Sequence, residues 1–330
     1  MSKFTDIFRE HILDRWLNET LKTPNFTRVS LAGDASFRRY HRVFANESQY
    51  VVMDAPPPEQ PKIFADIALS LEKHGLTVPR ILSAEFEHGF LLLSDFGDRL
   101  YLSELNEKTA DKLYRDALDA LLKIQACQAP VPMLDLSFIQ KQFGIFEDWY
   151  LKKHKLLSIS DEIQKVLMSF YALISKSFEE QPQVFVHQDY HSRNLMRLES
   201  NNPGILDFQD AMRGPITYDL VSLLQDYYIS WPRASVEAWV SDFQMRATQV
   251  GLLKPGLEPT KFMRWFDWTG LQRHLKNLGT FARLHYRDKK SGYLKDIPQI
   301  LRYISETCHR YEELLPLWAF LKNLPETEEA

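Results

Sequence analysis

The stretch VFVHQDYHSRNLM at residues 184–196, followed by GILDFQDA at residues 204–211, places a cluster of polar side chains between short apolar runs. Short apolar runs of this kind are typical of buried strands, so the polar residues between them are expected in loops. Asp189 and Asn194 fall in the first loop, and Asp207 ends the second apolar run. Two carboxylates and an amide make a poor zinc site, because zinc prefers nitrogen and sulfur ligands. The same oxygen donors suit a hard cation such as Mg²⁺.

The spacing of these residues predicts phosphoryl transfer. His187, Asp189 and Asn194 follow the pattern H-x-D-x-x-x-x-N, and Asp207 begins a D-F-x turn, as in the catalytic and metal-binding loops of protein kinases. In that chemistry Asp189 accepts or orients the proton of the attacking hydroxyl, while Asn194 and Asp207 hold Mg²⁺ against the phosphates of ATP. We expect His187 to brace the loop from inside.

Two other interpretations of the motif are available. The residues can form an ordinary polar loop in which they cap neighbouring elements. His187 and His191 are also four residues apart, but a zinc-protease helix would need glutamate where Gln188 stands. The conjunction with Asp207 favours the kinase interpretation over both.

The pattern of the chain changes near residue 100. Before it, β-rich runs separated by turn residues predict three strands, one helix and two strands, and the helix covers residues 62–76. After it, apolar residues recur mostly at helical spacing. We expect an N-terminal lobe at residues 1–96 and a C-terminal lobe at residues 97–330, joined by a hinge at about residues 94–98.

Composition excludes several classes of protein. Hydrophobic residues make up 45% and charged residues 25% of the 330 residues, which is typical of a globular protein. The net charge of −4 provides no general attraction to nucleic acid or to anionic lipid. No apolar run is long enough to span a membrane, no secretory leader is recognisable, and two cysteines are too few for a disulfide framework. These features predict a soluble cytoplasmic protein, which we assume to be a monomer.

The motifs together resemble the aminoglycoside-phosphotransferase-like branch of the protein-kinase-like superfamily, over nearly the whole chain. The chain is more similar still to the bacterial anomeric sugar kinases, which act on N-acetylmuramic acid and N-acetylglucosamine in cell-wall recycling. This resemblance implies a bilobal α+β fold, with a small five-stranded antiparallel N-lobe carrying one helix and a larger, mostly helical C-lobe. It also implies transfer of the γ-phosphate of ATP to the anomeric hydroxyl. Besides the opening motif, the stretches that carry it are GDASFRRYHR (33–42), VVMDAPP (51–57), GFLLLSDFGD (89–98) and WTGLQRHLKNLGTFARLHYRD (268–288).

The resemblance also implies roles for residues outside the opening motif. Asp219 matches the buried aspartate that ties down the catalytic-loop backbone, and it can cap a helix at the same time. Ser94, Asp95 and Phe96, with Gly97, match the hinge whose main chain contacts the adenine edge. A plain turn is the alternative there.

The phosphate-binding part of the kinase pattern is incomplete. The turn after the first strand has a single glycine, so backbone N–H groups of Ala35, Ser36 and Phe37 are expected to approach the phosphates. Met53 and Asp54 stand where kinases carry the third-strand lysine. Arg38 and Arg39 should point to opposite faces of the sheet, because side chains alternate along a strand. We choose Arg39 as the nucleotide-facing cation, against the alternative of a solvated strand arginine.

The acceptor side is predicted from the helical run at residues 262–287. One face of this run is apolar, and another carries cations that border the expected sugar pocket or are simply solvated. A cation there could pair with the lactyl carboxylate that muramic acid has and glucosamine lacks. Tryptophans in the run could stack on a pyranose, or pack in the core. The residues assigned to substrate binding are Arg193, Trp268, Arg273, His274 and Lys276.

Two other functions stay open. The protein can be a kinase of a different small acceptor, such as an aminoglycoside, an amino alcohol or a nucleoside. It can also be a pseudokinase that binds nucleotide without turnover, which the missing lysine and the thin glycine loop suggest. The presence of Asp189, Asn194 and Asp207 argues against the pseudokinase, which would be free to lose them.

Overall fold

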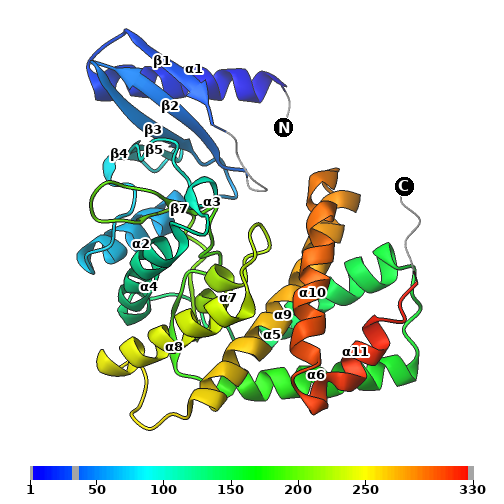
Figure 1. Cartoon of the computed structure of the whole chain (residues 1–330). Coiled ribbons are helices and arrows are strands. Elements are labelled where there is room, and N and C mark those ends of the chain that lie inside the picture. Colours follow the sequence, from blue (N-terminus) through cyan, green and yellow to red (C-terminus); the bar gives the residue numbers. More distant parts are fainter. Residues whose placement is uncertain (1–2, 32–36, 326–330) are drawn as a thin grey trace. The chain divides into compact units, whose positions relative to one another are not determined.

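The computed structural model describes residues 3–31 and 37–325 of the chain (Figure 1). The chain forms two compact units, of which the first comprises Met1–Leu100 and Leu195–Gln209. The second comprises Tyr101–Asn194 and Asp210–Ala330. The first unit therefore extends past the boundary expected at residue 96 and takes in a second segment of the chain.

The second segment joins the first unit through backbone hydrogen bonds. It contains a hairpin of β7 (Leu195–Met196) and β8 (Gly204–Ile205). The N–H of Ile205 donates to the carbonyl of Thr77 at 2.8 Å, and the N–H of Arg197 donates to the carbonyl of Arg99 at 2.6 Å. Sequence reasoning could not find this pairing, because the bonded residues lie about a hundred positions apart along the chain.

A five-stranded antiparallel sheet forms the centre of the first unit. This confirms the sheet predicted from the sequence, and each expected strand is present. In spatial order the strands are β1 (Phe26–Ser30), β2 (Arg39–Ala45), β3 (Ser48–Asp54), β5 (Phe90–Ser94) and β4 (Ile81–Glu85).

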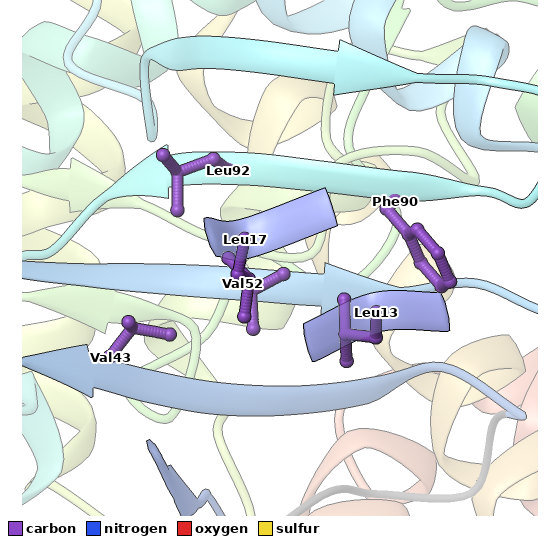
Figure 2. Close-up of a cluster of buried hydrophobic side chains, with 6 residues drawn as sticks. All are labelled: Leu13, Leu17, Val43, Val52, Phe90 and Leu92. Atoms are coloured by element: carbon purple, nitrogen blue, oxygen red, sulfur yellow. The ribbon is translucent and has the colours of Figure 1, made fainter. Parts of the chain in front are cut away.

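The helix α1 (Lys3–Leu21) covers one face of this sheet and was not among the expected elements. Its sequence mixes acids and bases with only a narrow apolar stripe, which is a weak signal for an amphipathic helix. Figure 2 shows that stripe meeting side chains from β2, β3 and β5. Burial of each such side chain contributes about 1.5–3 kcal/mol. The buried residues of the cluster are Leu13, Leu17, Val43, Val52, Phe90 and Leu92.

The helix α2 (Pro61–Lys73) is the helix predicted for the first unit. It begins at Pro61, whose fixed φ suits the first helical position. It ends before Gly75, which adopts a φ of 71° that side chains disfavour. Phe64, Ile67 and Leu71 form its buried face.

The second unit is mostly helical, as expected. Among residues 3–31 and 37–325, no helix combines the length and apolar character needed to span a membrane. A short two-stranded sheet of β6 (Gln183–Val186) and β9 (Met212–Pro215) interrupts the helices. The helices are α3 (Tyr101–Glu104), α4 (Ala110–Ala126), α5 (Leu136–Ile145), the π-helix η1 (Phe146–His154), α6 (Asp161–Glu179), α7 (Tyr218–Leu224), α8 (Arg233–Gln249), α9 (Pro259–Tyr286), the 3₁₀ turns η2 (Ser291–Asp296) and η3 (Glu312–Leu314), α10 (Ile297–Cys308) and α11 (Leu315–Leu321).

The long helix α9 packs closely on its neighbours at two glycines. A Cβ added to Gly279 would lie 2.3 Å from the carbonyl oxygen of Ile145, the last residue of α5. A Cβ added to Gly270 would lie 2.4 Å from Oε1 of Gln225, which follows α7. Real Cβ atoms do not approach this closely, so glycine at both positions allows α9 to lie against these elements. This contact places Arg273 beside the loop that follows β6.

Candidate active site

A buried carboxylate fixes the backbone where β6 ends and the catalytic loop begins. Asp219, in the first turn of α7, is completely buried. Its Oδ2 accepts from the backbone N–H of His187 at 2.6 Å, and its Oδ1 accepts from that of Gln188 at 2.9 Å. Burial raises the pKa of Asp219 to about 6, although the charge of His187 and these N–H donors oppose the shift. The backbone clamp expected for Asp219 is therefore present as two hydrogen bonds.

A second buried carboxylate, which sequence reasoning missed, fixes the far part of the same loop. Asp226 is 2% exposed, and its Oδ2 accepts from the N–H and the hydroxyl of Ser192 at 3.1 and 2.5 Å. The phenol of Tyr303 donates to the carbonyl of Asp226 at 3.2 Å. An acidic residue directly after an apolar helix was the available signal, but nothing in the sequence linked it to Ser192.

Arg273 of α9 binds the middle of the loop. Its Nη1 donates to the carbonyl of Gln188 at 2.8 Å, and its Nη2 lies 3.3 Å from Oδ1 of Asp189. The arginine side chain is 3% exposed, and its guanidinium lies 5.6 Å from the ring centroid of Tyr218. Arg273 was expected to border the sugar. In the structure its side chain instead binds the catalytic loop at Gln188 and Asp189.

The environment of Asp189 favours its ionised form. Burial on its own would raise the pKa of this carboxylate, but the positive charges of Lys276 and Arg273 outweigh it and lower the pKa well below its usual value. The side chain of Asp189 is still 45% exposed, so a small molecule can reach it. The group is an accessible carboxylate that stays charged at neutral pH.

Asn194 is positioned by the same loop. Its Nδ2 donates to the backbone carbonyl of Asp189 at 2.9 Å, and its own N–H donates to the carbonyl of His191 at 2.9 Å. The amide oxygen is the atom by which an asparagine side chain binds a cation, because its nitrogen is a hydrogen-bond donor. That oxygen fits Mg²⁺, which takes oxygen ligands.

Asp207 follows β8 in the first unit. Its backbone φ of 62° is unusual for a residue with a side chain, and the residue is exposed. Nε2 of Gln209 donates to its Oδ1 at 2.8 Å. An accessible carboxylate of this kind also suits a hard cation. Within the described residues, no group of three or more histidine, cysteine or acidic side chains is placed to hold a metal ion.

The residues expected to contact nucleotide lie in the first unit, and two of them, Ala35 and Ser36, are outside the described residues. Phe37 is described, and its N–H donates to Oε1 of Glu59 at 3.1 Å. Its phenyl ring is 64% exposed. Phe37 therefore already gives its backbone donor to a carboxylate.

The segment at residues 94–98 is held by hydrogen bonds. Ser94 pairs with Arg80 through both its N–H and its hydroxyl, each at 2.9 Å. The carboxylate of Asp95 accepts from Nε of Arg42 at 2.5 Å and from the N–H of Gly97 at 2.8 Å. The ring of Phe96 packs on the backbone of Gly204, where a Cβ would come within 2.8 Å of it.

Arg39 lies on the face of the sheet that α1 covers. Its Nε donates to Oδ2 of Asp54 at 3.0 Å, and Nε of Arg9, from α1, donates to Oδ1 of the same carboxylate at 2.7 Å. Asp54 is 2% exposed. Asp54, at the expected lysine position, thus forms ion pairs with Arg9 and Arg39. Arg39, the residue chosen as the nucleotide-facing cation, pairs with this buried carboxylate.

The residues expected to bind substrate have different surroundings in the structure. The guanidinium of Arg193 lies 4.8 Å from the ring centroid of Tyr228 and donates to its hydroxyl at 3.1 Å. Lys276 is partly buried and acts electrostatically on Asp189. His274 is 1% exposed and stacks on Tyr303 at 5.0 Å. Burial lowers the pKa of His274 to about 3, so this imidazole is a neutral core group and a sugar contact does not fit it.

Trp268 is also almost completely buried. It is 4% exposed and lines a cavity of about 500 Å³ beside α6 and α9. Stacking on a sugar at the loop is therefore not supported for this residue. The cavity is lined by Leu173, Lys176, Ser177, Glu180, Thr260, Lys261, Arg264, Trp265, Trp268 and Tyr311.

Comparison with known families identifies the class of enzyme. The model of the phosphotransferase enzyme family matches residues 27–259, which include Asp189, Asn194 and Asp207. The chain belongs to this family. It is therefore a kinase that transfers phosphate to an alcohol acceptor and uses ATP. This confirms the family and the enzyme class predicted from the sequence.

Curated relatives cover almost the whole chain. A protein of Pseudomonas aeruginosa is 40% identical over 99% of this chain and 100% of its own length. A protein of Neisseria meningitidis serogroup B is 35% identical over 97% of both chains. Both carry the name N-acetylmuramate/N-acetylglucosamine kinase.

Solved structures support the fold. An ADP-bound aminoglycoside phosphotransferase is 18% identical with a TM-score of 0.58, and covers 89% of this chain and 97% of its own. An ethanolamine kinase of Plasmodium vivax is 11% identical with a TM-score of 0.66, and covers 93% of this chain and 90% of its own. These similarities confirm the predicted protein-kinase-like fold.

Proposed function

We propose that this kinase transfers the γ-phosphate of ATP to the anomeric C1 hydroxyl of N-acetylmuramate, N-acetylglucosamine or both. The observation that carries the proposal is the ionised, accessible Asp189, held by Arg273 in a loop that also presents Asn194. The full-length similarity to named N-acetylmuramate/N-acetylglucosamine kinases supports the choice of acceptor. The proposal includes a role in cell-wall sugar recycling in the cytoplasm.

The reaction needs no covalent enzyme intermediate. The acceptor oxygen attacks the γ-phosphorus in line, while the bond from phosphorus to the β–γ bridging oxygen breaks and ADP leaves. Asp189 orients the anomeric hydroxyl and accepts its proton as the new P–O bond forms. An anomeric hydroxyl is more acidic than an ordinary alcohol, but the lowered pKa makes Asp189 a weak base, so its main role would be to orient this hydroxyl and to take the proton late in the transfer. The product is the sugar 1-phosphate.

Other residues position the reacting groups. Asn194 and Asp207 would hold Mg²⁺ through oxygen atoms, and the ion would neutralise charge on the phosphates. Asp219, through its bonds to the backbone of His187, and Asp226 keep the loop in one conformation. Such positioning is the main source of rate enhancement in phosphoryl transfer.

Nucleotide and sugar would be recognised by separate groups. The main chain at residues 94–96 is proposed to contact the adenine edge, with its conformation fixed by Arg42 and Arg80. On the acceptor side, Lys276 and Arg193 are proposed to pair with the lactyl carboxylate of N-acetylmuramate, because charge-assisted bonds to a carboxylate are strong. These two cations replace Arg273 and His274 in that role.

The test is ³¹P NMR of the protein with MgATP and each amino sugar. An anomeric phosphate signal should appear with wild type and be absent with Asp189→Asn, which keeps the shape of the side chain. Nucleotide binding by the variant, measured by calorimetry, should be close to that of wild type. If neither sugar is phosphorylated while an aminoglycoside, choline or a nucleoside is, the acceptor is wrong. Saturable ATP binding without turnover on any acceptor would instead identify a pseudokinase.

The role of Lys276 is tested by the preference between the two sugars. Lys276→Met should raise KM for N-acetylmuramate by about 10-fold, the value of one charge-assisted bond at a partly exposed site. KM for N-acetylglucosamine should change little, because this sugar has no lactyl carboxylate. Equal effects on both sugars would assign Lys276 to the electrostatics of Asp189 alone.

A further inference from the structure

The first unit lacks the lysine that normally faces the phosphates, and the residues at its position cannot replace it. Met53 is fully buried and uncharged. Asp54 is an anion that binds Arg9 and Arg39 on the face covered by α1. A triphosphate carries several negative charges, so another cation should meet it. The Asp54 cluster occupies the face covered by α1, so we expect that cation on the opposite face of the sheet.

Arg38 lies on that opposite face. Side chains alternate along an extended chain, so Arg38 points away from Arg39 and to the same side as Tyr40. Tyr40 pairs in register with Met53, and the charge of Arg38 acts on the hydroxyl of Tyr40. Arg38 therefore sits next to the position where a third-strand lysine would emerge.

A carboxylate holds Arg38 in place. Nη2 of Arg38 lies 2.8 Å from Oε2 of Glu59, and the two side chains are only 12% and 11% exposed. The other oxygen, Oε1, accepts from the N–H of Phe37 at 3.1 Å. Glu59 thus binds the side chain of one residue and the backbone of its neighbour. It comes from the segment just before α2, so the pair links the sheet to that helix.

Arg38 and the proposed metal ligand Asp207 both act electrostatically on Tyr40. Burial raises the pKa of Tyr40 to about 12, while the charge of Arg38 opposes the shift and the charges of Asp207 and Glu59 add to it. The pKa of Tyr40 therefore depends on the charges of Arg38, Asp207 and Glu59. All four residues belong to the first unit, so this grouping is a property of that unit.

We propose that Arg38, positioned by Glu59, is the cation that binds the nucleotide phosphates in this kinase. The inference rests on the proposed function and specifies how its nucleotide site works without the third-strand lysine. A guanidinium has five N–H donors in a planar fork, so pairing with Glu59 is compatible with contacts to phosphate oxygens. Arg38 would be the phosphate-binding residue and Glu59 its positioning residue.

The experiment compares variants of the full chain by calorimetry with adenosine, MgADP and MgATP, and by kinetics with N-acetylglucosamine. Arg38→Met should weaken MgATP binding roughly 10- to 100-fold, the value of a charge-assisted hydrogen bond. Adenosine binding should change much less, because adenosine has no phosphate. Arg38→Lys should recover most of the affinity by restoring the charge. Glu59→Gln should raise KM for ATP several-fold with a smaller effect on kcat.

Arg28→Met is the matched control, because Arg28 is a similarly buried strand arginine that pairs with Asp14 at 2.8 Å. It should leave nucleotide binding unchanged. If wild type phosphorylates the sugar but Arg38→Met binds MgATP as wild type does, Arg38 is not the cation, and the proposed function stands. A loss with Arg39→Met instead would transfer the role to Arg39. A wild-type protein that binds no nucleotide would overturn both proposals. If Arg38→Met does not fold, the other two variants still test the inference. It would be overturned if Glu59→Gln binds ATP as tightly as wild type and Arg38→Lys loses equal affinity for adenosine and for ATP.

Discussion

Replacement of Arg273 should lower both the stability of the protein and its kcat. Two variants, one without the charge and one with it, distinguish the effect of the charge from that of the bonding geometry. Arg273→Met fills similar space but removes the bonds to the carbonyl of Gln188 at 2.8 Å and to Asp189 at 3.3 Å. The first is a charge-assisted hydrogen bond at a buried site and contributes about 1.5–3 kcal/mol. The second is long, and the carboxylate is 45% exposed, so it contributes below about 1 kcal/mol. The variant should therefore lose about 1.5–4 kcal/mol of unfolding free energy.

The larger effect should be on turnover. If the loop relaxes so that Asp189 moves by about 1 Å, kcat should fall roughly 100-fold. Arg273→Lys keeps the charge but cannot bind both partners in the same planar geometry, so its kcat should also fall. A full kcat in Arg273→Met would refute the assignment of Arg273 as a positioning residue.

The pH dependence of kcat distinguishes the two variants. The pKa of Asp219 is about 6, whereas that of Asp189 lies well below its usual value. As pH falls through about 6, Asp219 gains a proton and accepts less well from the N–H groups of His187 and Gln188. The fall of kcat on the acidic side should therefore lie near pH 6, while Asp189 stays ionised. The charge of Arg273 lowers the pKa of both groups. The acid limb should therefore move to higher pH in Arg273→Met and stay in place in Arg273→Lys; an identical limb in both variants would contradict this account.

Three further changes test packing and ion pairing by thermal and denaturant unfolding. Gly279→Ala should lower the free energy of unfolding by about 1–3 kcal/mol, because its new Cβ would lie 2.3 Å from a backbone oxygen. Gly144→Ala, where a Cβ meets nothing within 4 Å, should be neutral or slightly stabilising and is its control. Arg233→Met should cost about 3–5 kcal/mol, because it leaves the fully buried Asp267 without the guanidinium 2.6 Å away; a loss below 1 kcal/mol would show that Tyr311 or water compensates. Leu17→Ala should cost about 2–5 kcal/mol, since Leu17 is fully buried under the sheet, and an unchanged midpoint would mean that α1 is not part of the stable fold.

The catalytic motif could be read from the sequence because its residues are close together along the chain. His187, Asp189 and Asn194 fall within eight positions, and their spacing carries the chemistry without knowledge of distant contacts. The strands and helices were predicted for a similar reason, since hydrophobic periodicity is a local property. The helix α1 was not expected, because its apolar stripe is narrow.

The partners of those residues depended on tertiary structure. Arg273 lies 84 positions after Asp189, and Asp226 lies 34 positions after Ser192. Cations on a helix predict a charged face, but they do not show which side of the helix meets the catalytic loop. Arg273, His274 and Lys276 were therefore assigned to one surface, although packing buries the first two and gives them different neighbours.

The sequence by itself determined the enzyme class, because a local motif specifies the groups that phosphoryl transfer needs. It also determined that two arginines after the first turn point to opposite faces of a strand. Only the tertiary structure showed that their surroundings differ, because Asp54 binds Arg39 under α1 whereas Glu59 binds Arg38 near the other face. Local spacing fixes which groups a chain has, whereas packing between distant segments fixes their partners, their burial and hence their charge.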